Sequence, residues 1–103
     1  MKEEHYYESY LCIGPCQYNT KEVRNELLDY FEKNSKKVFG YWPDITNHSL
    51  WGFHKDGISI HLQITKLKEP ESNFVDVRLV SDKTPTKDLE EKLKKLIEPF
   101  KLK

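Results

Sequence analysis

Two histidines and two cysteines are the residues of this sequence best suited by type to hold a metal ion or to carry redox chemistry. His54 and His61 flank a short segment that contains Asp-Gly, and Cys12 and Cys16 bracket Ile-Gly-Pro. Across a hairpin, the two imidazoles lie diagonally at a separation that a metal ion could bridge. A zinc site needs further ligands, however, and no later cysteine follows. The cysteine spacing also differs from the Cys-x-x-Cys of thiol oxidoreductases. We therefore expect free thiols, no metal site and no cofactor.

No catalytic set is visible in the sequence. General acid–base catalysis needs a titratable group within hydrogen-bond reach of its partner, and a nucleophile needs a neighbouring base. No residues adjacent in sequence form such a set, and the four glycines stand singly, which excludes a glycine-rich phosphate loop. The sequence predicts a protein that is not an enzyme.

Length, charge and hydropathy narrow the class of protein further. The 103 residues suit one domain, over residues 1–103. Lysine plus arginine and aspartate plus glutamate both total 17, so the formal net charge is zero and the general attraction to nucleic acid is missing. No apolar run approaches the roughly 20 residues that span a bilayer. Because the start "MKEEHYYESY" lacks the layout of a signal peptide, we expect a cytoplasmic location and no membrane contact.

The elements that must position these residues begin with a hairpin. "SLWGFH" and "GISIHLQITKL" flank Asp56–Gly57, the favoured pair for a two-residue type I′ turn. Pairing outward from that turn places Trp51 and Phe53 on the apolar face of the hairpin. It places His54 and His61 on the polar face.

The remaining segments complete one domain of the α+β class. Alternation predicts strands at 6–14 and 74–82, and apolar spacing predicts helices at 19–34 and 84–100. Asn19 is expected to cap the first helix, while Thr84 or Thr86 caps the second and Pro85 sits in its first turn. The segment 36–45 is either a short strand, over Lys36–Trp42, or a loop that packs its aromatic residues. Pairing strand 57–67 with 74–82 places Gln63 beside Asp76 and His61 beside Arg78.

We expect a single antiparallel sheet of four or five strands with both helices on one face, which leaves the other face at least partly open. With residues 36–42 as a strand, the order β-α-β-β-β-β-α resembles that of TATA-binding-protein-like and helix-grip domains. The resemblance concerns topology alone and implies no functional residue. It directs attention to the open sheet face and to a cleft between the sheet and the C-terminal helix.

The open face is the strongest candidate site because it gathers side chains common at binding hot spots. The expected binding residues are Tyr6, Tyr10, His54, His61, Gln63, Phe74 and Arg78, with Glu8 and Asp76 among them. An ordinary solvent-exposed sheet face, or one covered by a terminus or by 38–42, is the alternative.

Three functions follow from these surfaces. The first is a non-enzymatic protein that binds a protein partner, or a second copy of itself, through the open face. The second uses the same face for single-stranded nucleic acid, with phosphate contacts from Lys36, Lys37, Lys66 and Lys68. The third is a cleft for an apolar ligand, lined by Trp42, Trp51, Phe53 and Phe100.

Overall fold

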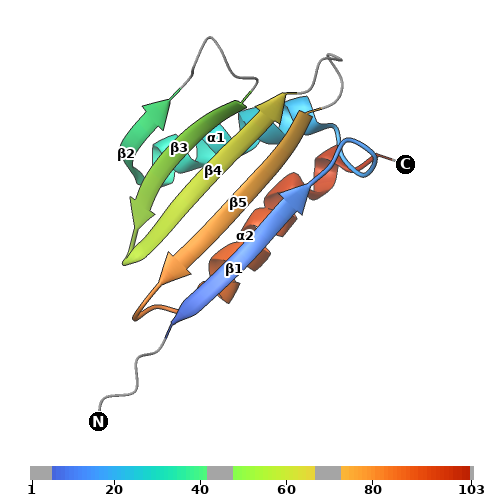
Figure 1. The fold of residues 1–103 in the computed structure, drawn as a ribbon. Coiled ribbons are helices and arrows are strands. Elements are labelled where there is room, and N and C mark those ends of the chain that lie inside the picture. The colour runs from blue at the N-terminus through green and yellow to red at the C-terminus, as the bar shows by residue number, and fades with distance from the viewer. Residues whose placement is uncertain (1–5, 42–47, 67–72, 103) are drawn as a thin grey trace.

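The structure, a computed structural model, describes residues 6–41, 48–66 and 73–102. It consists of one five-stranded antiparallel sheet and two α-helices (Figure 1), so the expected α+β class is confirmed. The elements, in chain order, are β1 (Tyr7–Ile13), α1 (Thr20–Asn34), β2 (Lys36–Tyr41), β3 (His48–Lys55), β4 (Ile58–Lys66), β5 (Asn73–Ser81), α2 (Lys87–Ile97) and a short 3-10 helix, η1 (Glu98–Phe100).

The strand order β1-β5-β4-β3-β2 places the first two strands of the chain at opposite edges of the sheet. Helix α1 carries the chain from one edge to the other, and strands β2 to β5 then return as a meander (Figure 1). The last strand therefore pairs with the first, from Tyr7 opposite Ser81 to Ile13 opposite Val75. This pairing brings the N-terminal residues beside residues about 70 positions away.

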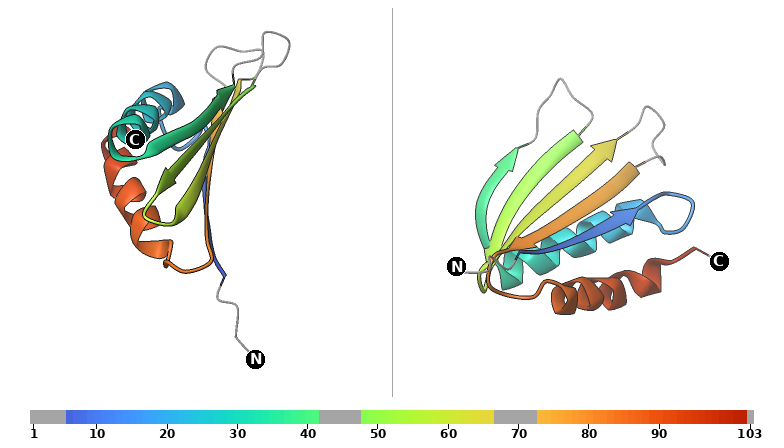
Figure 2. Two further views of the ribbon diagram at one scale, coloured as in Figure 1. Left: turned by 90° about the vertical axis from the view of Figure 1, so that its left-hand side faces the viewer. Right: turned by 60° about the horizontal axis from the view of Figure 1, so that its bottom comes forward.

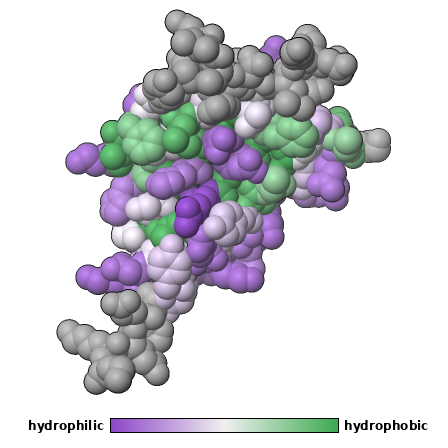
Figure 3. Space-filling view, in the orientation of Figure 1, coloured by the Kyte–Doolittle hydropathy of each residue, from purple (hydrophilic) through white to green (hydrophobic). Residues whose placement is uncertain are grey.

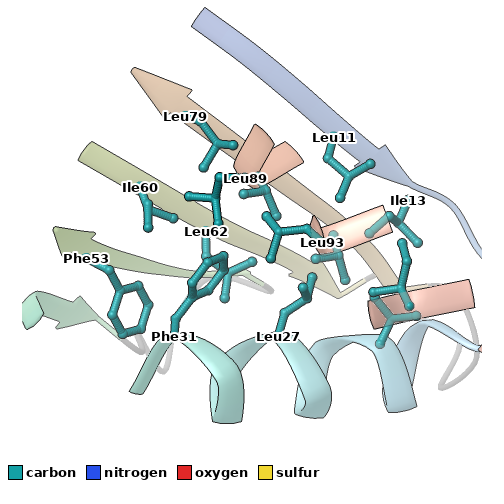
Figure 4. Packing of buried hydrophobic residues seen from close by; sticks show 14 of the residues in the cluster. Leu11, Ile13, Leu27, Phe31, Phe53, Ile60, Leu62, Leu79, Leu89 and Leu93 are labelled. Atoms are coloured by element: carbon teal, nitrogen blue, oxygen red, sulfur yellow. The ribbon is translucent and has the colours of Figure 1, made fainter. Parts of the chain in front are cut away.

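Both helices cover the same face of the sheet, as expected (Figure 2). The core lies between them and the sheet, where the alternating apolar residues of the strands meet the apolar stripes of the helices (Figure 4). Its largest fully buried side chains include Phe31 of α1 and Phe53 of β3, whose ring centroids are 5.3 Å apart. No helix of residues 6–41, 48–66 and 73–102 lies on the opposite face.

The hairpin has the expected register, with Lys55 opposite Ile58 and Gly52 opposite His61. Asp56 and Gly57 both have positive φ, 48° and 82°, as a type I′ turn requires. The second expected register is also confirmed, since His61 lies opposite Arg78 and Gln63 opposite Asp76.

The ambiguous segment 36–45 forms edge strand β2 over its first six residues, and residues 42–45 lie outside the described part. A bulge interrupts its pairing with β3 between Lys37 and Phe39. The indole ring of Trp51 packs on Gly40, where an added Cβ would lie 2.3 Å from the ring. Trp51 is therefore only half-buried at the border of the core, while Phe53 is fully inside it.

The start of α2 differs from the expected one. The helix begins at Lys87, so Pro85 precedes it and does not sit in its first turn. Thr86 occupies the N-cap position, but its side chain caps no backbone N–H. Its hydroxyl is instead hydrogen-bonded to the Ser9 hydroxyl of β1 at 2.8 Å, and both side chains are buried. At α1, by contrast, Asn19 accepts a hydrogen bond from the Glu22 N–H, as expected.

Candidate binding surface

The face of the sheet without helices, here called the open face, presents one set of side chains from each strand. Register and burial assign to it, besides Tyr6, the residues Glu8, Tyr10, Cys12, Lys36, Phe39, Leu50, Gly52, His54, Ser59, His61, Gln63, Thr65, Phe74, Asp76, Arg78 and Val80. All seven residues expected at the binding site lie on this face. Phe74 is half-buried near one end of it, whereas Tyr6 and Tyr10 are well exposed, at 60% and 63%.

The middle of the open face is a row of residues that crosses all five strands. The pairings place Tyr10, Arg78, His61, Gly52 and Phe39 side by side in this order. Because Gly52 has no side chain, the Phe39 ring lies over its backbone, and an added Cβ would lie 2.2 Å from the ring. The same ring meets His61 edge-on at 6.3 Å between centroids. An aromatic side chain therefore stands at each end of the row.

A charged cluster lies at the Tyr10 end of this row. The Arg78 Nε donates a hydrogen bond of 2.8 Å to the Glu8 carboxylate, which also accepts one from the Tyr10 hydroxyl. The Arg78 guanidinium lies 5.8 Å from the centre of the Tyr10 ring, and Tyr6 is hydrogen-bonded to Arg78 as well. The hydrogen bond from Tyr10, followed by that from Arg78, lowers the pKa of Glu8. The same bond raises the pKa of Tyr10. The charge of Arg78 is thus balanced within the protein.

A shallow hollow of about 430 Å³, here called the Asp76 hollow, lies beside this cluster. It extends across β1, β5, β4 and β3 and is lined by Tyr10, Leu11, Cys12, Leu50, His61, Gln63, Asp76, Val77 and Arg78. The Cys12 thiol is hydrogen-bonded to the Asp76 carboxylate, which raises the pKa of the thiol. Cys12 and Cys16 are both free and exposed.

A second, smaller hollow of about 150 Å³, the histidine hollow, lies toward β2. It is lined by Val38, Phe39, Gly52, Phe53, His54, Ser59 and His61. The structure thus brings His54 and His61 together, as the hairpin register predicts. Within residues 6–41, 48–66 and 73–102, no three histidine, cysteine, aspartate or glutamate side chains form a group that could hold a metal ion.

Figure 3, which looks onto the open face, shows hydrophilic and hydrophobic residues interspersed rather than one continuous apolar surface. Three apolar residues of this face, Phe39, Leu50 and Val80, are absent from the sequence-based candidates. The hairpin register is sufficient to predict Leu50 on this face, because Leu50 is two residues before Gly52 and so shares its face. The sequence does not predict the face of Phe39, because its segment is either a strand or a loop by sequence alone.

Trp42, Trp51, Phe53 and Phe100 are the residues expected to line an apolar-ligand cleft, and two of them, Phe53 and Phe100, lie near opposite ends of α1. Phe53 is buried against Phe31, near the end of α1. Phe100 lies at the start of α1, where its carbonyl accepts a hydrogen bond of 2.9 Å from the Asn19 N–H. The 12 residues from Asn19 to Phe31 span about 18 Å of helix. Trp42 lies outside the described residues.

The geometry defines the class of protein as a small α+β domain with one chemically mixed sheet face that no helix of the described residues covers. Comparisons with protein-family models, with curated proteins and with solved structures find no match for this chain. None of the helices in the described ranges is both long enough and apolar enough to cross a membrane.

Proposed function

We propose that this chain is a cytoplasmic, non-enzymatic binding protein that contacts a protein partner through its open face. The observation that carries the proposal is the position of the exposed aromatic residues. The large hydrophobic side chains most exposed in the described ranges are Tyr6, Tyr10, Val38, Phe39 and Leu102, and three of these five belong to the open face. Aromatic side chains next to arginine are the composition typical of binding hot spots.

The charges of the open face favour a protein over a nucleic acid. Among the described residues, and with histidine counted as neutral, its charged side chains are Glu8, Asp76, Lys36 and Arg78, which sum to zero. Arg78 is already paired with Glu8. Phosphate binding needs cations that are available to replace counterions.

The lysines considered for phosphate contacts also give the nucleic-acid function little support. Of the two lysines whose side chains are described, Lys36 and Lys37, only Lys36 shares the open face, because Lys37 lies with its ammonium 5.2 Å from the Trp51 ring, on the helix-covered side of β2. The side chains of Lys66 and Lys68 lie outside the described part of the chain. Single-stranded nucleic acid is therefore the second candidate.

The test is the paired substitution Tyr10→Ala and His61→Ala, which removes two side chains of the central row. The matched control is Glu91→Ala with Lys95→Ala, on the exposed side of α2. We expect the open-face pair to weaken partner binding at least about tenfold and the control to leave it unchanged. Partners are identified by mass spectrometry after affinity capture from cells that make the protein, and circular dichroism checks the fold.

The purified chain alone is measured by size-exclusion chromatography with light scattering. A dimer that the open-face substitutions dissociate identifies the partner as a second copy. The proposal is refuted if the open-face pair and the control pair show the same partner binding and the same oligomeric state. Binding of a single-stranded oligonucleotide that weakens steeply with salt supports the second candidate instead.

A further inference from the structure

The two carboxylates of the open face differ in their partners. Glu8 is held by Arg78 and Tyr10. Asp76 receives a hydrogen bond from the Cys12 thiol but has no ion pair with any described residue. Lys36, the other cation among the described residues of this face, is on β2, three strand spacings or about 14 Å from the strand of Asp76. The Asp76 carboxylate is thus half-buried, charged and available to a ligand.

The surroundings of this carboxylate set the chemistry of that ligand. Asp76 lies in a row with Gln63 and Leu50, and Leu50 is the apolar side chain at the β3 side of the Asp76 hollow. The Tyr10 ring stands on β1, at the other side. Among the described residues, the charged groups around the hollow are Glu8, Asp76 and Arg78, which leave one net negative charge. A cation on an apolar stem complements both properties.

We propose that the Asp76 hollow receives a lysine or arginine side chain of the protein partner, with its methylene groups against Leu50 and its charged head at the Asp76 carboxylate. The inference rests on the proposed function and specifies the chemistry of the partner. The neighbouring Arg78 opposes a second cation, but Glu8 lies 2.8 Å from its Nε and balances its charge. Long basic side chains bury their stems on apolar surface while the charge keeps polar contacts.

The test uses peptides of one design, acetyl-Gly-Ser-X-Ser-Gly-amide, with lysine, arginine, norleucine or glutamate at X. Binding is followed by NMR through the methyl signals of Leu50 and the side-chain amide of Gln63. We expect the lysine and arginine peptides to bind about five- to tenfold more tightly than the norleucine peptide, which has the stem without the charge. The glutamate peptide is expected to bind most weakly.

The substitution Asp76→Asn should abolish the preference for the basic peptides, and Asp76→Glu, which keeps the charge, should retain it. The matched control Asp82→Asn changes an exposed aspartate that does not line the hollow and should leave the preference intact. Equal binding of the lysine, arginine and norleucine peptides, no shift at Leu50 and Gln63 with any of them, or a preference that survives Asp76→Asn would overturn the inference.

The captured partner separates this inference from the proposed function. If Tyr10→Ala with His61→Ala abolishes the partner complex and Asp76→Asn leaves it intact, the inference of a basic partner side chain is wrong. The proposal that the open face binds a partner is then still supported. If none of these substitutions changes the complex, the proposed function itself fails. The expected result is loss of the complex in the double variant and about fivefold weaker binding in Asp76→Asn.

Discussion

At the scale of single residues, the charged cluster of the open face joins side chains that are far apart in the sequence. Glu8 and Arg78 are 70 positions apart, and the pairing of β1 with β5 brings them together. Tyr10 completes the cluster with its hydroxyl on the same carboxylate. These contacts predict measurable shifts in ionisation.

The pKa of Glu8 should lie below that of an ordinary glutamate, mainly because the Tyr10 hydroxyl donates to its charged form. Tyr10→Phe removes that donor and should raise the pKa of Glu8, as followed by NMR titration of its carboxyl carbon. Since the folded-state pKa is the lower one, the stabilisation by Glu8 is present above the ordinary glutamate pKa and is lost as the pH falls through the folded value. Tyr30→Phe, which removes a hydroxyl in contact with Lys55 instead, is the control. A Glu8 pKa unchanged in Tyr10→Phe contradicts the assigned hydrogen bond.

The thiol of Cys12 should titrate at higher pH than an ordinary cysteine, chiefly because its neutral form is hydrogen-bonded to Asp76. In a Cys16→Ser background, Asp76→Asn should lower the Cys12 pKa and speed its alkylation at a fixed, mildly alkaline pH, because the thiolate is the reactive form. The pH profile of the iodoacetamide reaction measures this. Identical profiles with and without Asp76 would show that the carboxylate does not govern the thiol.

The sequence predicts the side of the sheet on which each of these residues lies, but not the contacts among them. Strict alternation in β4 and the type I′ turn are local signals, so His61 and Gln63 could be placed by counting. The bond from Arg78 to Glu8 depends on the partner strand of β1, which no local pattern specifies. Phe39 was missed for a related reason, because its strand could not be identified.

At the scale of elements, edge strand β2 contributes an aromatic residue to the open face only because its neighbour β3 has a glycine there. The Phe39 ring lies over Gly52, with no room for a Cβ between them. Strand β2 escaped secure prediction because its helix-side positions hold Lys37 and Gly40, and a bulge interrupts its alternation. A strand without apolar alternation cannot be told from a loop by pattern.

Gly52→Ala should displace the Phe39 ring and lower the free energy of unfolding by about 1 to 3 kcal/mol. In a Phe39→Ala background the same change meets no ring and should cost much less. Urea denaturation of the four proteins gives this coupling as a double-mutant cycle. Additive effects would mean that the two residues do not compete for the same space.

A buried hydroxyl pair joins strand β1 to the start of α2, where the sequence predicts only a helix cap. Thr86→Ala leaves the Ser9 hydroxyl buried without its partner and should lower the free energy of unfolding by about 1 to 3 kcal/mol. Ser9→Ala with Thr86→Ala should cost less than the sum of the single changes, because neither polar group then remains. Thermal and urea unfolding of the four proteins tests this. A double variant as unstable as that sum would contradict the pairing.

At the scale of the whole molecule, the path of the described chain leaves one face of the sheet without a helix. Helix α1 spans the sheet from β1 to β2, and α2 packs on the same side after β5 (Figure 2). The sequence predicts this layering, since each helix has one apolar stripe and the sheet alternates cleanly. It does not predict the two hollows, whose shapes depend on how side chains from three or four strands meet.

The central claim, that the open face binds a protein, is tested most directly by photo-crosslinking from opposite ends of the central row. A benzophenone amino acid replaces Tyr10 in one variant, Phe39 in a second and Lys92, on the exposed side of α2, in a third. In cells that make the protein, the Tyr10 and Phe39 variants should crosslink to the same protein, identified by mass spectrometry, and the Lys92 variant should not. Crosslinks from Tyr10 and Phe39 that match those from Lys92, or none from either, would contradict the account.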